Sequence, residues 1–172
     1  MAAIRNWPPL TDLKSVRAFV SMCSYYRKFV DGFARIAQPL TDLMEKDCFK
    51  TPFSQEVLDA FEQLKVALTS APVLQYFDVN RKTELYVDAC KSSIGAVLQQ
   101  VNDHGDSLPA GYYSRRLNSA EMNYSTYDKE FLGLRDGVLH FRYQLLGIKF
   151  DVRTDHCSLR YSTIPRNGNR HF

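Results

Sequence analysis

Between residues 70 and 83 the spacing of apolar side chains changes from helical to extended, and this single change decides the class of fold. Upstream of it, apolar residues recur every three or four positions, as they do along one face of an amphipathic helix. Downstream, short runs of apolar and β-branched residues are separated by turn formers, as they are in strands. We therefore predict an α+β chain in which a helical segment precedes a sheet.

Three helices are predicted before this change. They cover residues 13–30, a short stretch near residues 39–46, and residues 57–68. Ser54 is a suitable N-cap for the third helix, because a serine oxygen accepts a hydrogen bond from the free N–H groups of a first helical turn.

After the change the predicted order of elements is β-β-β-α-β. Three strands, at residues 83–89, 94–100 and 110–114, form an antiparallel meander, and a fourth strand covers residues 149–154. The helix between the third and fourth strands has the most regular apolar spacing in the chain, so its apolar face should pack on the sheet. That face consists of Tyr127, Phe131, Leu134, Val138, Phe141 and Leu145.

Composition narrows the class of protein. The 172-residue chain is 45% hydrophobic and 13% aromatic, which is enough to bury a core and excludes a disordered or collagen-like chain. No apolar run approaches the roughly 20 residues of a membrane span, and residues 1–14 contain no apolar signal-peptide core. The four cysteines lack the close pairing of a zinc site, so we expect reduced thiols in an intracellular protein. The formal net charge is +3, and the basic excess lies within residues 1–50, where it could meet phosphates or form an ordinary solvated helix face.

Three carboxylates occupy special positions in this pattern. Asp88 follows apolar residues at the end of the first strand, and Asp155 closes the fourth. Glu130 lies in the first turns of the long helix, beside its apolar face. If the first and fourth strands are parallel neighbours, both strand ends and the helix start converge at one edge of the sheet, and the three acids share one pocket. Each acid taken alone also suits an ordinary role as a solvated, capping or loop residue.

Three like charges in one pocket repel one another, and divalent cations remove this repulsion. Hard cations such as Mg²⁺ choose oxygen ligands, and two of them about 3.5 to 4 Å apart can clamp the attacking and leaving oxygens of a phosphodiester. The sequence therefore predicts metal-assisted phosphodiester hydrolysis, with two Mg²⁺ or Mn²⁺ ions held by Asp88, Glu130 and Asp155.

Two glycines and one histidine lie close to these acids. Gly133 and Gly137 share the helix face of Glu130 and would let the helix backbone approach the sheet, although a helix can also simply tolerate them. His156 adjoins Asp155 and could shuttle a proton or help to release product; a plain loop histidine is the alternative.

Motifs along nearly the whole chain resemble one family. LKSVRAFVSMCSYYRKFV (residues 13–30) and IAQPLTDLM (residues 36–44) resemble the thumb region of the reverse transcriptase of gypsy-type long-terminal-repeat retrotransposons. FEQLKVALTSAPVL (residues 61–74) resembles its connecting helix. Three further stretches resemble its ribonuclease H motifs in their usual order, namely YVDACKSSIGAVLQQ, YYSRRLNSAEMNYSTYDKEFLGL and LLGIKFDVRTDHCSLRY.

The resemblance implies a fragment of a retrotransposon Pol polyprotein with a ribonuclease H-like mixed sheet. Its parts would be a thumb-like helical remnant (1–48), a connecting helix and linker (49–82), a truncated ribonuclease H-like domain (83–165) and a divergent tail (166–172). Asp88, Glu130 and Asp155 would be its metal-binding catalytic acids. No two aspartates are adjacent, so no polymerase active site is expected.

The implied activity is metal-dependent endonucleolytic cleavage of the RNA strand of an RNA/DNA hybrid during reverse transcription. The implied partners are that hybrid and the rest of the Pol polyprotein, with its polymerase and integrase parts, and no membrane. The implied location is intracellular, in the cytoplasm, a virus-like particle or the nucleus. Candidate nucleic-acid contacts are Tyr25, Tyr26, Arg27, Lys28 and Ser92, although helix packing is an alternative role for the two tyrosines.

Two other interpretations stay open. Cys90 and Ser93 stand where the family commonly has Ser and Gly, which bears on the backbone contacts near Asp88. The final residues YSTIPRNGNRHF depart from the family's pattern, so one carboxylate and one strand are expected to be missing. The chain could then be a catalytically inactive, nucleic-acid-binding fragment of a reverse transcriptase. The remaining possibility is an unrelated α/β domain whose acids coincide by chance.

Overall fold

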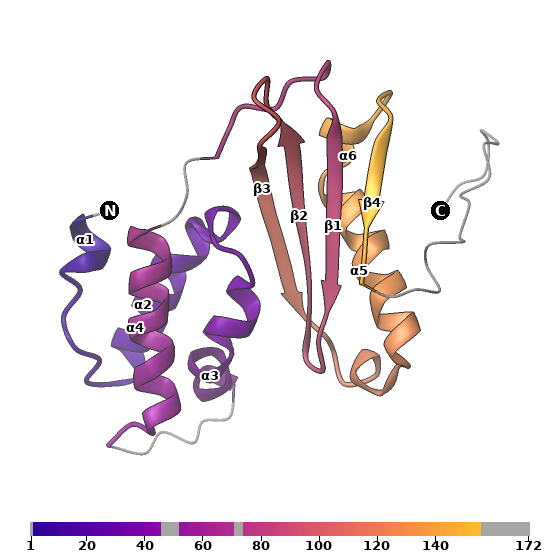
Figure 1. The fold of residues 1–172 in the computed structure, drawn as a ribbon. Coiled ribbons are helices and arrows are strands. Elements are labelled where there is room, and N and C mark those ends of the chain that lie inside the picture. The colour runs from indigo at the N-terminus through magenta and orange to yellow at the C-terminus, as the bar shows by residue number, and fades with distance from the viewer. Residues whose placement is uncertain (1, 46–51, 71–73, 156–172) are drawn as a thin grey trace.

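The computed structural model describes residues 2–45, 52–70 and 74–155, which form a helical segment, a four-stranded sheet and a helix on one face of that sheet (Figure 1). The helices of the helical segment are α1 (Ala2–Arg5), α2 (Leu13–Tyr25), the 3-10 turn η1 (Arg27–Phe29), α3 (Phe33–Glu45) and α4 (Gln55–Thr69). The predicted α+β order, with helices before the sheet, is confirmed. None of the described helices is both long enough and apolar enough to cross a bilayer.

The helical segment has an apolar core of its own. Phe19 of α2 is fully buried, and its ring centroid lies 5.6 Å from that of Trp7 and 4.6 Å from that of Phe61. Leu40 of α3 and Leu64 of α4 belong to the same core and are also fully buried. Burying one such side chain is worth about 1.5–3 kcal/mol, so the segment is a packed unit and not a loose arm.

Helix α3 begins at Phe33, well before the start predicted near residue 39, and carries Pro39 inside it. Proline lacks the N–H group that would bond to the carbonyl four residues earlier, and it is common in the first turn of helices. For this reason the sequence predicts a helix that starts near Pro39. Its neighbours Ala37 and Leu40 are buried in the helical core. This tertiary packing keeps the helix continuous through the proline.

The other two predicted helices lie close to their expected bounds. The first ends at Tyr25 and is followed by the separate turn η1, so it does not run as one helix to residue 30. The third, α4, begins at Gln55 directly after Ser54. Ser54 occupies the predicted N-cap position, but its side chain makes no capping hydrogen bond.

The sheet has the strand order β3-β2-β1-β4. Its strands are β1 (Thr83–Ala89), β2 (Ser93–Val101), β3 (Ser107–Arg116) and β4 (Phe150–Arg153). β2 is antiparallel to both β1 and β3, whereas β4 is parallel to β1. The sheet is therefore mixed, as predicted from the meander followed by a helical crossover.

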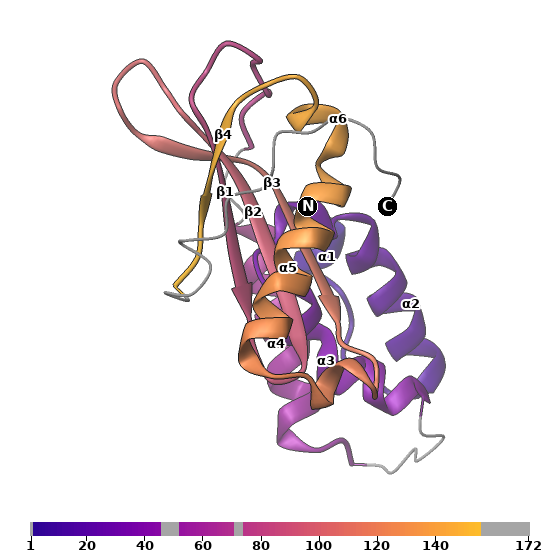
Figure 2. The same cartoon turned by 90° about the vertical axis from the view of Figure 1, so that its right-hand side faces the viewer.

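Helix α5 (Thr126–His140) and the short α6 (Arg142–Leu145) cover one face of the sheet (Figure 2). Ser125 caps α5, because its hydroxyl oxygen accepts a hydrogen bond from the N–H of Asp128 at 3.1 Å. Leu85, Leu98 and Phe141 form the buried core between the helices and the strands. This second core is separate from that of the helical segment.

The predicted apolar face packs on the sheet in its second half, where Leu134, Val138, Phe141 and Leu145 belong to or pack against the core between the helices and the strands, but not in its first half. Tyr127 and Phe131 belong to the predicted face, but their side chains are 41% and 51% exposed. Gly133 and Gly137 face the strands, and a Cβ atom at these positions would lie 2.9 Å from Val87 Cγ1 and 2.8 Å from Ala96 Cβ, respectively. Only a hydrogen atom fits there, so the glycines bring the helix backbone against the sheet, as predicted, and turn the two aromatic rings outward.

The helical segment packs against the β3 side of the sheet, through α3 and η1 (Figure 1). The backbone N–H of Ala34 donates a hydrogen bond to Ser114 Oγ at 3.0 Å, and Arg116 pairs with Asp42 at 2.7 Å. β4 forms the opposite edge of the sheet. The segment boundaries predicted at residues 48, 82 and 165 stay predictions.

Candidate active site

Two of the three predicted acids lie at or just beyond the ends of neighbouring parallel strands. β1 and β4 pair in register up to Tyr86 and Arg153. Asp88 and Asp155 each lie two residues beyond this last pair, and both side chains are exposed. Because parallel strands end at the same edge of a sheet, the pairing brings both acids to that edge.

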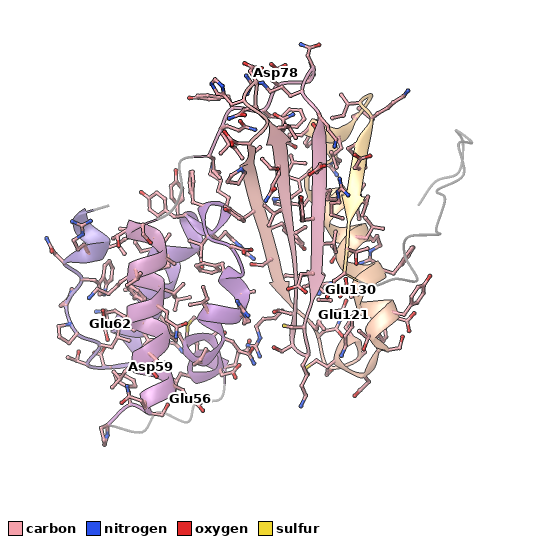
Figure 3. The ribbon with its side chains drawn as sticks, viewed as in Figure 1. Glu56, Asp59, Glu62, Asp78, Glu121 and Glu130 are labelled. Carbon is pink, nitrogen blue, oxygen red and sulfur yellow. The ribbon has the colours of Figure 1, made fainter. Side chains whose placement is uncertain are left out.

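Glu130 reaches the same edge from the first turns of α5. Figure 3 shows it at the lower end of the sheet, where β1 ends, whereas Asp78 lies at the upper end. Glu130 is only 3% exposed. Its carboxylate accepts a hydrogen bond from the backbone N–H of Ala89, and the Thr154 hydroxyl donates a long one to Oε2 at 3.4 Å. The close approach of α5 at Gly133 holds Glu130 over the end of β1.

The environment of Glu130 opposes its ionisation. Burial raises the pKa of this carboxyl, and the negative charges of Asp155 and then Asp88 raise it further. The hydrogen bonds from Ala89 and Thr154 act in the other direction and are outweighed. Within the described parts of the chain, no Lys, Arg or His side chain forms an ion pair with Glu130. The three acids thus interact electrostatically, and none of them forms an ion pair with a Lys, Arg or His side chain of the described residues. Their catalytic role stays a prediction.

The chemistry of these donors fits a hard divalent cation. Carboxylate oxygens are the ligands that Mg²⁺ prefers, and such an ion would neutralise a buried carboxylate such as Glu130. Over residues 2–45, 52–70 and 74–155, no three His, Cys, Asp or Glu side chains already form a group that could hold a metal ion. The predicted catalytic residue His156 lies outside the described residues.

Glu84 is a further acid of β1, and it was not among the residues predicted from the sequence. It shares one face of the strand with Tyr86 and Asp88, because alternate residues of a strand point to the same side. Glu84 is 5% exposed and forms ion pairs with Arg153 at 2.9 Å and Lys82 at 3.0 Å. The hydrogen bond from Arg153, followed by that from Lys82, lowers the pKa of Glu84 to about 2. Unlike Glu130, this carboxylate is neutralised by its own cations, and only its alternation with Asp88 could have indicated it.

A groove runs along this face of the sheet beside Asp88. Tyr86 and Cys90 line it from β1 and the turn after it, and Ser114 lines it from β3. Arg35 of α3 lines its other wall. The groove therefore links the acidic edge of the sheet with the helical segment.

Three of the predicted nucleic-acid contacts lie at or near the end of α2. Tyr25 is 78% exposed, whereas Tyr26 is partly buried and packs against the core of the helical segment. Lys28 is exposed, and its ammonium group lies 5.2 Å from the centre of the Phe29 ring. Tyr26 therefore has the packing role that was the alternative for the tyrosines, and Tyr25 and Lys28 are accessible to a ligand.

The other two predicted contacts have partners within the protein. The guanidinium of Arg27 donates a hydrogen bond to the backbone carbonyl of Ser114. The hydroxyl of Ser92 donates one to Oε1 of Gln38 at 2.9 Å. Both bonds join the helical segment to the sheet, a role that could not be predicted from the sequence because the partners are far apart along the chain.

Residues 53–152 match the family model described as an RNase H-like domain found in reverse transcriptase. The matched range includes α4, the whole sheet except the last residue of β4, and α5.

Two relatives and one solved structure extend this comparison. The chain is 39% identical over 159 residues to the retrovirus-related Pol polyprotein from transposon 297 of Drosophila melanogaster, an alignment that covers 92% of this chain and 14% of the polyprotein. It is 34% identical over 158 residues to the transposon Tf2-3 polyprotein of Schizosaccharomyces pombe, covering 91% of this chain and 12% of that one. The chain thus spans only a small part of the length of these relatives.

The solved structure is a foamy viral protease-reverse transcriptase in complex with an RNA/DNA hybrid. It superposes with a TM-score of 0.72 over 92% of this chain and 21% of that one, at 19% sequence identity. At this identity the likeness shows a shared fold.

Proposed function

Because this chain belongs to the family of RNase H-like domains found in reverse transcriptases, as a fragment of a retrotransposon Pol polyprotein, we propose that it cleaves the RNA strand of an RNA/DNA hybrid by metal-dependent endonucleolytic hydrolysis. The main support is the edge of the sheet to which β1, β4 and α5 bring Asp88, Asp155 and Glu130. There, a buried carboxylate has two acidic neighbours and no cation among the described residues to balance it.

In this proposal Asp88, Glu130 and Asp155 hold two Mg²⁺ or Mn²⁺ ions. Such ions, when bound, supply the positive charge that activates water and stabilises the leaving oxygen, so that hydrolysis gives a 3′-hydroxyl and a 5′-phosphate. The N–H of Ala89 and the hydroxyl of Thr154 orient the Glu130 carboxylate at the strand ends. Burial of Glu130 keeps water away from one side of the site, which strengthens the electrostatic interactions there.

We propose that His156, next to Asp155, moves a proton or assists product release.

The groove beside Asp88 is the proposed path of the hybrid. Arg35 on its helical wall is exposed and offers a cation to a backbone phosphate. Selectivity for the RNA strand over the DNA strand would come from contacts to the 2′-hydroxyls, which only the RNA strand carries. The foamy viral reverse transcriptase with a similar fold was solved with such a hybrid. The remaining proposed partners are the polymerase and integrase parts of the same Pol polyprotein, inside the cell.

A catalytically inactive, nucleic-acid-binding fragment is the second candidate function. It is favoured by the finding that the described acidic side chains do not already form a group of three metal ligands. It predicts hybrid binding that weakens steeply with salt, and no cleavage with any divalent metal.

The proposed activity is tested by incubating the full chain with an end-labelled RNA/DNA hybrid in the presence of Mg²⁺ or Mn²⁺. Asp88→Asn is the informative variant, and Asp151→Asn is its matched control, because Asp151 is an exposed carboxylate of β4 that pairs with Lys82 at 3.6 Å. We expect cleavage by the wild type, a loss of about 100-fold or more in Asp88→Asn, and no loss in Asp151→Asn.

Two results would contradict the proposal. Metal-dependent cleavage that survives in Asp88→Asn would remove Asp88 from the mechanism. A wild type that binds the hybrid but cleaves it with neither metal would favour the inactive, nucleic-acid-binding fragment.

A further inference from the structure

Helix α3 contacts the sheet along one stripe of positions spaced four residues apart. At one end of the stripe, the N–H of Ala34 donates to Ser114 Oγ at 3.0 Å. At the other end, Asp42 pairs with Arg116 at 2.7 Å. Positions four apart lie above one another on a helix, so Gln38 occupies the middle of the same stripe. Both flanking contacts go to β3 and fix α3 against the sheet.

Gln38 reaches a different part of the sheet, the turn that follows Asp88. Its Oε1 accepts a hydrogen bond from the Ser92 hydroxyl at 2.9 Å, between residues 54 positions apart in the sequence. From the other side, the N–H of Leu117 donates to the carbonyl of Ser92 at 2.8 Å. The turn between β1 and β2 is therefore held between α3 and the end of β3.

We infer that Gln38 is a positioning residue for this turn and, through it, for Asp88. Asp88 is the last residue but one of β1, so a displacement of the turn displaces its carboxylate. The opposite side of α3, with Ala37 and Leu40, is buried in the core of the helical segment, which gives the helix the rigidity to hold the turn. The helical segment then contributes to the geometry of the candidate active site. This conclusion rests on the proposed function, whereas the inference that Gln38 holds the turn does not.

The chain contains a probe of the turn that needs neither metal nor substrate. Cys90 lies in the turn, is partly buried, and has its Sγ 2.9 Å from Ser93 Oγ. Because Cys90 also lines the groove beside Asp88, its rate of alkylation by iodoacetamide, measured by peptide mass spectrometry on the full chain and compared between variant and wild type, reports a change in the exposure of this thiol when the turn is displaced. Cys23 is fully buried in the core of the helical segment, so its alkylation rate reports unfolding of that segment in the same experiment.

Three variants separate the hydrogen bond from other effects. Gln38→Leu removes the acceptor at similar volume, whereas Gln38→Glu keeps an acceptor oxygen. Gln55→Leu is the matched control, because Gln55 on α4 donates to Asp59 at 2.7 Å, within its own helix. We expect Gln38→Leu to raise the alkylation rate of Cys90 about fivefold, the effect of losing one ordinary hydrogen bond. Cys23 should keep its rate, and the other two variants should match the wild type.

Several results would overturn the inference: an unchanged Cys90 rate in Gln38→Leu, an equal rise at Cys90 and Cys23, or a Gln38→Glu variant that behaves like Gln38→Leu. The outcome is independent of hybrid cleavage. If the wild type cleaves the hybrid but Gln38→Leu leaves the alkylation rate of Cys90 unchanged, the positioning role is rejected. If the wild type does not cleave the hybrid but Gln38→Leu raises the alkylation rate of Cys90, the positioning role is kept and the proposed function is rejected.

Discussion

Replacing Gly137 by alanine tests the close approach of α5 to the sheet, because two effects of this change have opposite signs. In an exposed helix interior, Gly→Ala stabilises by about 1 kcal/mol. Here the added Cβ would lie 2.8 Å from Ala96 Cβ and 3.7 Å from Leu85 Cδ2. Carbon atoms in good contact are about 3.5–4.0 Å apart, and the Cβ of Ala96 is fixed to its strand, so α5 and β2 have to separate by about 1 Å.

The expected cost follows from these two terms. Overpacking of a well-packed core costs about 1–3 kcal/mol, and a neighbour that cannot rotate away places Gly137→Ala at the upper end of that range. Subtracting the gain of about 1 kcal/mol in helix propensity leaves a net loss of about 2 kcal/mol. For a chain of this size, that loss lowers the midpoint of thermal unfolding, followed by circular dichroism, by roughly 4–8 °C.

A second substitution shows whether the clash is the cause. Ala96→Gly removes the atom that the new Cβ would meet, so Gly137→Ala combined with Ala96→Gly should be more stable than the sum of the single changes predicts, by about 1 kcal/mol or more. The close packing of α5 on β2 would be refuted if Gly137→Ala unfolded at the wild-type temperature or above it. Strict additivity of the two changes would refute the contact with Ala96.

Glu130 and Glu84 are expected to affect the stability of the fold with opposite dependence on pH. The pKa of Glu130 is raised by burial and by Asp155 and Asp88, so the folded state loses stability as the pH rises through that pKa. Glu130→Gln should therefore raise the urea midpoint at neutral pH while abolishing hybrid cleavage; a lower midpoint would contradict this. The pKa of Glu84 is lowered from 4.5 to about 2 by Arg153 and Lys82, so it contributes stability that is present above 4.5 and is lost as the pH falls toward 2. Glu84→Gln should remove that part of the acid dependence in urea titrations across this range, and an unchanged pH profile would show that the pairing does not stabilise the fold.

The strands and the long helix could be predicted because the spacing of apolar residues within each segment indicates its secondary structure directly. Residues 83–89 are predicted as a strand with Asp88 near its end, and β1 has these bounds. The exposure of Tyr127 and Phe131 could not be predicted from apolar spacing, because Gly133 and Gly137 bring the helix backbone against the sheet through the space they leave empty. Pro39 misled the prediction of α3, since burial of its neighbours outweighs the lost hydrogen bond.

The same distinction holds for the candidate site. Asp88, Glu130 and Asp155 could be singled out because strand ends and a helix start are local features of the sequence. Gln38 could not, because its partner in the turn is 54 residues away, and no local pattern marks a hydrogen bond between two packed segments. The pairing of Glu84 with Arg153 was missed for the same reason, since Arg153 lies on a strand 69 residues later.

The parallel pairing of β1 with β4 has an evolutionary consequence. The turn at Asn102–Asp106 lies at the far end of the sheet from the acids, so residues added there leave the two strand ends in place. One residue inserted within β4 would instead reverse its alternate side chains and carry Asp155 to the opposite side of the sheet. Among related retrotransposon copies, the length of this turn should therefore vary freely. Changes in the length of β1 or β4 should instead be eliminated by selection.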